Sequence, residues 1–232
     1  MDLLAEGIRR AFQLLLAGDA EVLGIALLSL QVSGAATLLS VLVGMSLGTA
    51  IALTRFPGKR LLVAVVNTGM GLPPVVVGLF VSLFLWRSGP LGSLGLLYTP
   101  AAIVLAQAVI ATPIVMGITI SAIQGLPPGL RLQALALGAT RPQMVWILVK
   151  EARLPLLAAV MAGFGGVISE VGASIMVGGN IRGYTRVLTT ATVMETGKGN
   201  FEVAIALSLL LLLACLAVNY LLTTVQQRER PR

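Results

Sequence analysis

Long apolar stretches alternate along this chain with short polar segments. Each stretch holds roughly 20 or more residues, enough for a helix to cross about 30 Å of hydrocarbon. The five stretches run approximately from Val22 to Thr54, Leu61 to Trp86, Pro100 to Ile123, Leu154 to Val177 and Phe201 to Val225. Because they are continuously apolar rather than alternating, they favour spanning helices over barrel strands. We predict an all-α integral membrane protein with about five transmembrane helices.

The segment before the first stretch has a different pattern. Its apolar residues recur at helical spacing opposite Arg9 and Arg10, and they are Leu3, Leu4, Ile8, Phe12 and Leu15. This pattern predicts a short amphipathic helix at the membrane interface, too short to span. The chain therefore divides into an interfacial segment (1–21), one transmembrane domain (22–225) and a tail (226–232).

Proline and glycine predict the shapes of individual spans. Pro73 and Pro74 should break the second stretch into two pieces, and Pro113 should kink the third. Gly44 and Gly48 form a GxxxG pattern in the first stretch, which indicates close contact with another helix.

Composition excludes most enzyme classes. Of 232 residues, 57% are hydrophobic and only 11% are charged, unlike a soluble globular enzyme. The chain has no His and one Cys, so His- or Cys-based metal clusters, intrachain disulfides and His-dependent triads are excluded. We expect no catalytic residue, no metal site and no cofactor bound by this chain. The net charge of +7 comes from Lys and Arg scattered between apolar stretches, which favours a topology signal over nucleic-acid binding.

The distribution of Lys and Arg predicts the orientation. With the N-terminus outside, ten of the sixteen basic residues fall in cytoplasmic segments. They are Arg55, Lys59, Arg60, Arg131, Arg141, Lys150, Arg153, Arg228, Arg230 and Arg232. We expect an external N-terminus and a cytoplasmic C-terminus.

The longest cytoplasmic segment, residues 124–153, is too long for a simple turn. It opens with a helix break at Pro127-Pro128-Gly129. Gly138-Ala139-Thr140 predicts a hinge, in which Gly138 ends one short helix and Thr140 caps the next. The alternative is an ordinary amphipathic loop.

This segment resembles a loop found in the permease subunits of binding-protein-dependent ABC importers. That loop has the form EAA, three residues, Gly, nine residues, I-x-L-P. Gly138 matches its Gly, Leu132-Gln133-Ala134 occupies the EAA position with only the second Ala kept, and Leu154-Pro155 matches its close. Pro155 lies 17 residues after Gly138 rather than the 13 of the family, which adds about one helical turn.

A second resemblance is more specific. The stretch VISEVGASIMVGGNIRGYTRVLTTAT (167–192) looks like the GEFGA…AGNIPGRTQTL pattern of molybdate and sulfate importer permeases. Its Ser-Glu-Val form and the flanking KEARLP and ETGKGNFEVAIALS look closest to tungstate-importer permeases. The resemblance implies a type I, MetI-like permease fold with cytoplasmic coupling helices, in a prokaryotic inner membrane. It also implies a homodimer with the pathway on its two-fold axis.

The resemblance further implies two protein partners, an extracytoplasmic substrate-binding protein and ATPase subunits that carry ATP and Mg. No G-x-x-x-x-G-K-[ST] pattern occurs in this chain, so we expect ATP to be bound by another polypeptide. The residues expected to dock on the ATPase subunit, or to pass its motion to the fourth span, are Gln133, Ala134, Leu137, Gly138, Ala139 and Pro155.

The candidate pathway or gate residues lie further along the chain. They are Glu170, Ser174, Asn180, Arg182, Thr185, Thr189, Thr192 and Thr196. Glu170 is expected well inside the fourth span, where an ionisable residue is functional by default. Since a bare carboxylate would repel a dianion, we favour a structural or gating role for Glu170 over substrate contact.

The four threonines recur at spacings of 4, 3 and 4, which places their hydroxyls on one face of a predicted short helix. Hydroxyl donors can replace part of the hydration of an oxyanion without holding it too tightly. Alternatively, these hydroxyls bond to their own helix and only pack.

The predicted function is thus that of a permease subunit for ATP-driven import of a tetrahedral oxyanion, with tungstate favoured by resemblance alone. Molybdate and sulfate remain alternatives, because no residue distinguishes these anions. An ion-coupled secondary transporter is an alternative of another class, but it would need intramembrane carboxylates near broken helices, and Glu170 alone is thin support.

Overall fold

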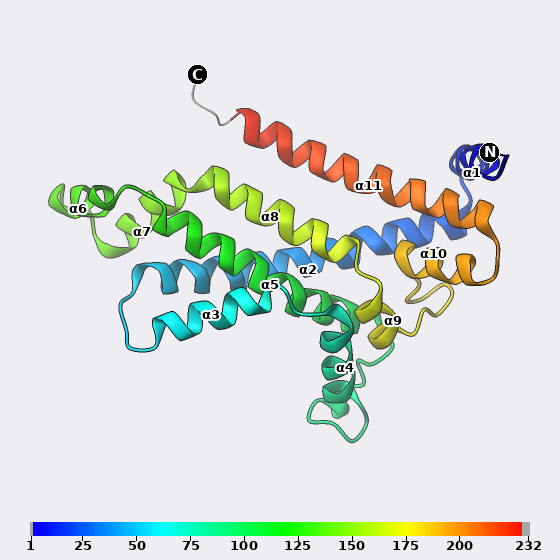
Figure 1. The fold of residues 1–232 in the computed structure, drawn as a ribbon, viewed down its shortest axis with the longest axis horizontal. Helices are drawn as coiled ribbons and strands as arrows, with labels where there is room; N and C mark the ends of the chain where they lie inside the picture. The colour runs from blue at the N-terminus through cyan, green and yellow to red at the C-terminus, as the bar shows by residue number, and fades with distance from the viewer. Residues whose placement is uncertain (1, 229–232) are drawn as a thin grey trace.

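Every regular element in residues 2–228, the part of the chain that the computed structural model describes, is helical (Figure 1). The elements are α1 (Asp2–Ala17), α2 (Ala20–Leu53), α3 (Lys59–Gly69), α4 (Pro74–Leu85), η1 (Gly92–Leu94), α5 (Pro100–Gln124), α6 (Pro128–Ala136), α7 (Arg141–Glu151), α8 (Arg153–Ile168), α9 (Gly172–Gly178), α10 (Leu188–Gly197) and α11 (Phe201–Arg228). Residues 229–232 of the predicted tail, which include the basic residues Arg230 and Arg232, lie outside the described residues.

The five predicted apolar stretches all form helices, but two of them are bent. Helices α2, α5 and α11 are each long and apolar enough to cross a membrane. The pair α3 and α4 bends by 101° and the pair α8 and α9 by 60°, so the count reaches five if each pair is one span. The first break lies at Pro73-Pro74, as predicted, where each proline removes a backbone donor. Figure 1 shows α4 turned away from the long axis that α2, α5 and α8 follow.

Small residues allow α2, α5 and α8 to meet around Val115. A Cβ added to Gly44 of α2 would lie 3.0 Å from Val115 of α5, and one added to Gly163 of α8 would lie 2.9 Å from it. Gly48 faces α5 as closely, since its added Cβ would lie 2.9 Å from the carbonyl oxygen of Met116. The GxxxG contact predicted from the sequence is confirmed, with α5 as the partner.

The two ends of the molecule differ. Figure 1 shows α6, α7 and the α2–α3 connection at one end of the long axis, and α1, α10 and the start of α11 at the other. The basic segments predicted to share a side, 55–60 and 131–153, therefore lie at the same end, and α11 runs toward it.

Helix α1 forms as expected from its amphipathic pattern. It packs on α11 so closely that a Cβ added to Gly7 would lie 2.5 Å from Cγ2 of Ile205. Ile8 and Phe12 are left exposed on another part of its surface. The helix is thus joined to the transmembrane region by packing as well as by the chain.

Candidate functional site

The break between α8 and α9 is the first part of the candidate site. Glu170 lies in this break, and its side chain is 7% exposed. Its Oε1 accepts a hydrogen bond from the backbone N–H of Ala173 at 2.9 Å, in the first turn of α9. Glu170 therefore lies inside the fourth predicted stretch, at a break in its helix that the sequence did not predict. The helix stops before it, because the carboxylate takes over a backbone donor at the start of α9.

Contacts with α4 and α5 stabilise this break. The added Cβ of Gly172 would lie 2.8 Å from Cγ2 of Val75 on α4, so only glycine permits this approach. Gln107 of α5 donates from Nε2 to the carbonyl of Val167 at 3.1 Å and to Oγ of Ser174 at 3.3 Å. Ser174, a predicted site residue, is therefore joined to the break through Gln107.

Gln107 is a site residue that our sequence reasoning missed. Its side chain is 2% exposed, and its Oε1 has no hydrogen-bond donor among residues 2–228. A lone amide in the otherwise apolar run PAAIVLAQAVIATP was the available signal, because a polar side chain in a span requires a partner.

The loop between α9 and α10 is a tightly bonded turn, as its glycines predicted. Gly179, Asn180 and Gly183 all have positive φ, at 71°, 50° and 74°. Thr185 donates from its hydroxyl to the carbonyl of Gly178 at 2.6 Å and accepts from the N–H of Ile181 at 2.9 Å. The loop is thereby closed on itself and presents a fixed surface.

Asn180 joins this loop to α10. Its Oδ1 accepts from the hydroxyl of Thr190 at 2.9 Å. Of the predicted threonines, α10 carries Thr189, Thr192 and Thr196, whereas Thr185 precedes it, so one helix does not present all four.

In this conformation each of the four threonine hydroxyls donates to a backbone carbonyl. Thr192 and Thr196 bond to Leu188 and Thr192 of their own helix, both at 2.8 Å. Thr189 instead bonds across to the carbonyl of Glu170. The back-bonding alternative therefore describes Thr192 and Thr196, while Thr185 and Thr189 connect separate segments.

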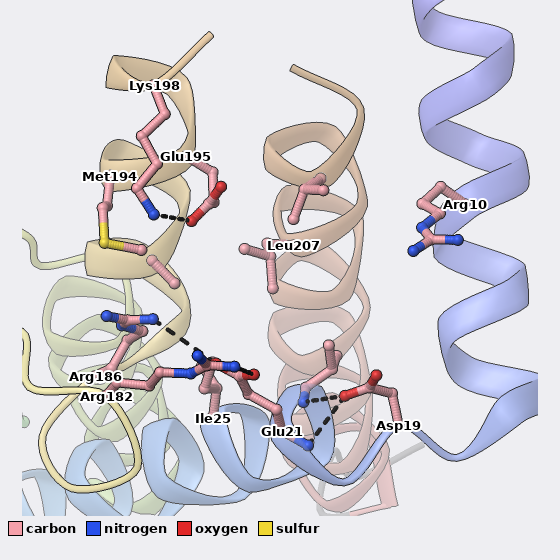
Figure 2. A pocket seen from close by; sticks show the side chains of 13 residues that line it. Arg10, Asp19, Glu21, Ile25, Arg182, Arg186, Met194, Glu195, Lys198 and Leu207 are labelled. Carbon is pink, nitrogen blue, oxygen red and sulfur yellow. Dashed lines mark hydrogen bonds and ion pairs between the residues drawn. The ribbon is translucent and has the colours of Figure 1, made fainter. Parts of the chain in front are cut away.

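A charged cavity of about 380 Å³ opens beside this loop, between α1, α2, α10 and α11 (Figure 2). Arg182 forms two hydrogen bonds to the carboxylate of Glu21, one of them from Nε at 2.7 Å, and Arg186 lies 3.7 Å from the same carboxylate. Hydrogen bonding to Glu21 raises the pKa of the Arg182 guanidinium above its ordinary value. Sequence reasoning placed Arg182 here and missed Glu21 as its partner, because the two are 161 residues apart.

A second ion pair lines the same cavity. Glu195 accepts hydrogen bonds from Nδ2 of Asn200 at 2.7 Å and from Nζ of Lys198 at 2.8 Å. The bond from Asn200, followed by that from Lys198, lowers the pKa of the Glu195 carboxyl below its ordinary value. The turn between α10 and α11 is thus fixed around one carboxylate.

The candidate coupling helices α6 and α7 form the hairpin that the sequence predicts. Gly138 has a φ of +84°, and Thr140 begins α7 with its N–H donating to Oε1 of Gln143 at 2.8 Å. Leu137, beside the hinge, is 88% exposed, which is unusual for so apolar a side chain. Gln133 and Gly138 are exposed too.

Ala134 departs from the predicted docking set. Its side chain is buried against Met144 and Leu148 of α7, so it holds the hairpin together instead of facing a partner. Pro155 lies in the first turn of α8, directly after α7. A displacement of the hairpin would therefore reach α8 without an intervening loop.

These features define a class of protein, the multi-pass helical membrane permease. The α6–α7 hairpin with its exposed Leu137 lies at one end, and the hydrogen-bonded α9–α10 loop lies near the other. Residues 19–231 match the family of the binding-protein-dependent transport system inner membrane component, and the chain belongs to this family.

Known relatives and one solved structure agree with this family. A "Probable anion ABC transporter permease protein" of Haloferax volcanii is 44% identical over 86% of this chain and 88% of its own length. The tungstate uptake system permease protein TupB of Peptoclostridium acidaminophilum is 39% identical over 98% of this chain and 100% of its own length. A crystal structure of an amino acid ABC transporter superposes with a TM-score of 0.67 at 19% identity, covering 94% of this chain and 98% of that one. This structure confirms the type I, MetI-like permease fold predicted for the chain.

Proposed function

We propose that this chain is the permease subunit of an ATP-driven importer of a tetrahedral oxyanion, with tungstate as the substrate. The observation that carries the proposal is similarity along nearly the whole chain to a permease named for tungstate uptake. The absence of a P-loop from the sequence supports a separate ATPase subunit as the site of ATP and Mg binding. Two copies of this chain would enclose the pathway.

The proposed direction of transport follows from the charges at the two ends. The end that carries α6 and α7 would face the cytoplasm, because the Lys- and Arg-rich segments lie there. The opposite end, with α1, α10 and the charged cavity, would receive the anion from an external binding protein. The N-terminus would then lie outside and the C-terminus inside.

Coupling to ATP hydrolysis would act through the α6–α7 hairpin. The side chain of Leu137 is exposed beside the glycine hinge. An exposed leucine at the end of a short hairpin suits insertion into a groove of the ATPase subunit. Movement of the groove would displace α7 and then Pro155 and α8. Because α8 ends at the break that holds Glu170, this displacement would reach the loop between α9 and α10.

The loop between α9 and α10 would act as a gate rather than as a tight binding site. The hydroxyls of Thr185 and Thr189 are engaged with backbone carbonyls, so an anion would meet them only after the segments separate. Hydroxyl donors without a fixed positive charge suit a site that an anion must leave quickly. Glu170 would serve as a structural acceptor at the start of α9.

Reconstitution tests the proposal. The permease, its ATPase and its binding protein are placed in proteoliposomes, and tungstate uptake is measured with and without ATP on the ATPase side. We expect uptake that requires ATP and the binding protein and that persists when a protonophore collapses the proton gradient. Uptake that ignores ATP but stops with the protonophore would instead support an ion-coupled transporter.

Two further measurements address the finer points. Competition by molybdate and sulfate in the same proteoliposomes ranks the three anions, and preference for molybdate or sulfate would replace tungstate as the substrate. Native mass spectrometry of the complex should show two copies of this chain. A single copy would contradict the homodimer.

A further inference from the structure

Two arginines of the α9–α10 loop converge on one carboxylate at the end opposite the α6–α7 hairpin. Arg182 binds both oxygens of Glu21, and Nη1 of Arg186 lies 3.7 Å from Oε1 of the same group (Figure 2). Glu195 also lies close enough to Arg186 for the guanidinium to contribute to the lowered pKa of that carboxyl. The cavity of about 380 Å³ is lined by four basic and three acidic side chains, so its lining carries one excess positive charge.

Arg186 is the incompletely satisfied member of this pair. Its side chain is only 14% exposed, and its Nε–H has no hydrogen-bond acceptor among residues 2–228. A largely buried guanidinium normally forms several charge-assisted hydrogen bonds, because desolvation is costly otherwise. The geometry around Arg186 therefore has a place for further negative charge.

The other carboxylates lining the cavity are already engaged. Asp19 accepts from the N–H groups of Glu21 and Val22, both at 3.0 Å, and so caps α2. Glu195 is bound by Lys198 and Asn200. Glu21 has no such tie to its own helix end, and the Arg182 side chain that holds it is 72% exposed. Exposed ion pairs of this kind are weak and exchange readily.

Glu21, Arg182 and Arg186 lie between two cavities. One cavity, of about 380 Å³, is also lined by Arg10 and Lys198. The other, of about 520 Å³, extends toward Leu28 and Tyr184. Glu21, Ile25, Arg182 and Arg186 line both cavities. Each cavity exceeds several times the roughly 30 Å³ share of a water molecule, so a hydrated oxyanion fits.

We propose that Arg182 and Arg186 form an oxyanion-binding site in which the carboxylate of Glu21 occupies the anion position, and that an incoming oxyanion displaces it. The inference rests on the proposed function and adds a binding step to it. A carboxylate and a tetrahedral oxyanion both present oxygens that two guanidiniums can bind in the same way. Displacing Glu21 frees the start of α2 from the α9–α10 loop and removes the wall between the two cavities.

Competition with Glu21 sets the sign of the expected effects. The apparent dissociation constant of an anion that must displace an internal carboxylate equals its intrinsic value divided by the fraction of sites that the carboxylate leaves free. Glu21→Gln keeps the size of the side chain and removes the competing charge, so tungstate should bind about tenfold more tightly. Arg186→Gln should weaken tungstate binding about tenfold or more, because it removes a charge-assisted donor.

The experiment uses the assembled permease–ATPase complex in nanodiscs without the binding protein. Calorimetry measures sodium tungstate binding to the original complex and to the Glu21→Gln, Arg186→Gln and Arg9→Gln variants. Arg9 is the matched control, since it lies at the same end, does not line the cavity and pairs with Glu6 of its own helix. Its variant should bind tungstate like the original complex.

Two results would overturn the site. They are equal tungstate affinity of Glu21→Gln and the original complex, or equal weakening by Arg186→Gln and Arg9→Gln. Thermal unfolding of each variant shows whether it is folded. Should Glu21→Gln be unfolded, Glu21→Ala is tested in its place with the same expected tightening. Absence of tungstate uptake by the original complex in the proteoliposome assay would reject the proposed function. Normal uptake in that assay, with unchanged tungstate affinities of the variants, would reject only this site.

Discussion

The hydroxyl of Thr189 donates a hydrogen bond of 2.9 Å to the backbone carbonyl of Glu170. Both groups are buried, and the bond joins α10 to the break between α8 and α9. The break would otherwise leave that carbonyl without an intrahelical donor. One threonine therefore connects the α8–α9 break with α10, the helix that borders the charged cavity.

Replacing Thr189 with Val should destabilise the protein by about 1–3 kcal/mol, because it leaves a buried carbonyl unsatisfied. Thr196→Val makes the same chemical change on the same helix, but Thr196 is exposed and bonds only to Thr192, so we expect less than about 0.5 kcal/mol. Unfolding of both variants in mixed micelles measures the difference. Tungstate uptake should also fall for Thr189→Val, and unchanged uptake would count against a gating contact.

Replacing Gly138 should disturb coupling more than folding. Its φ of +84° strains any other residue by about 1–2 kcal/mol, yet an added Cβ would meet no atom within 4 Å. Gly138→Trp should therefore leave the transmembrane helices intact while it blocks docking of the hairpin on the ATPase subunit. We expect ATP hydrolysis that no longer responds to the loaded binding protein.

Gly129→Ala provides a control for the hairpin itself. Gly129 lies in α6, and its added Cβ would lie 4.0 Å from the nearest side-chain atom, so alanine fits there. This variant should retain coupled ATP hydrolysis. If Gly138→Trp couples as well as Gly129→Ala, the hairpin is not the docking element.

Gly48 supports a prediction about packing between α2 and α5. An added Cβ would lie 2.9 Å from the Met116 carbonyl oxygen and from Cβ of Thr119, so Gly48→Ala must push the two helices apart. We expect a loss of about 1–3 kcal/mol in unfolding free energy. Gly34→Ala on the same helix meets nothing within 4 Å and should leave stability unchanged or raise it by up to about 1 kcal/mol, because alanine favours a helix more than glycine does. Equal losses would show that alanine itself, rather than the contact, is responsible.

Much of the fold could be predicted from local sequence signals. Apolar length predicted the spans, Pro73-Pro74 predicted the first break, and Gly138 with Thr140 predicted the hairpin. In each case the deciding group is in the segment itself: a missing donor, a positive φ or a capping side chain. Such signals do not depend on the rest of the molecule.

The second break could not be predicted in this way. No proline stands at 169–171, and the backbone groups at this break are bonded both by the nearby Glu170 carboxylate and by distant side chains. Gln107 binds the carbonyl of Val167, and Thr189 binds that of Glu170. The Glu21–Arg182 pair was missed for the same reason, since only the folded chain brings the start of α2 to the α9–α10 loop.

Glu195 supports a prediction about pH. Hydrogen bonds from Asn200 and Lys198 lower its pKa, so the folded state favours the ionised carboxylate. This stabilisation is complete above the ordinary pKa of 4.5 and is lost as the pH falls through the lower pKa of the folded protein. Glu195→Gln should therefore lower the thermal stability at pH 7, and the difference from the original protein should shrink below about pH 4.5.

Glu202→Gln serves as the control for this pH dependence, because Glu202 is an exposed carboxylate in the first turn of the neighbouring α11. Melting temperatures of the three proteins between pH 3 and pH 7 provide the comparison. We expect the Glu195→Gln curve to converge on that of the original protein at low pH. A constant offset across this range would show that the amide disturbs packing, and that ionisation of Glu195 does not stabilise the turn between α10 and α11.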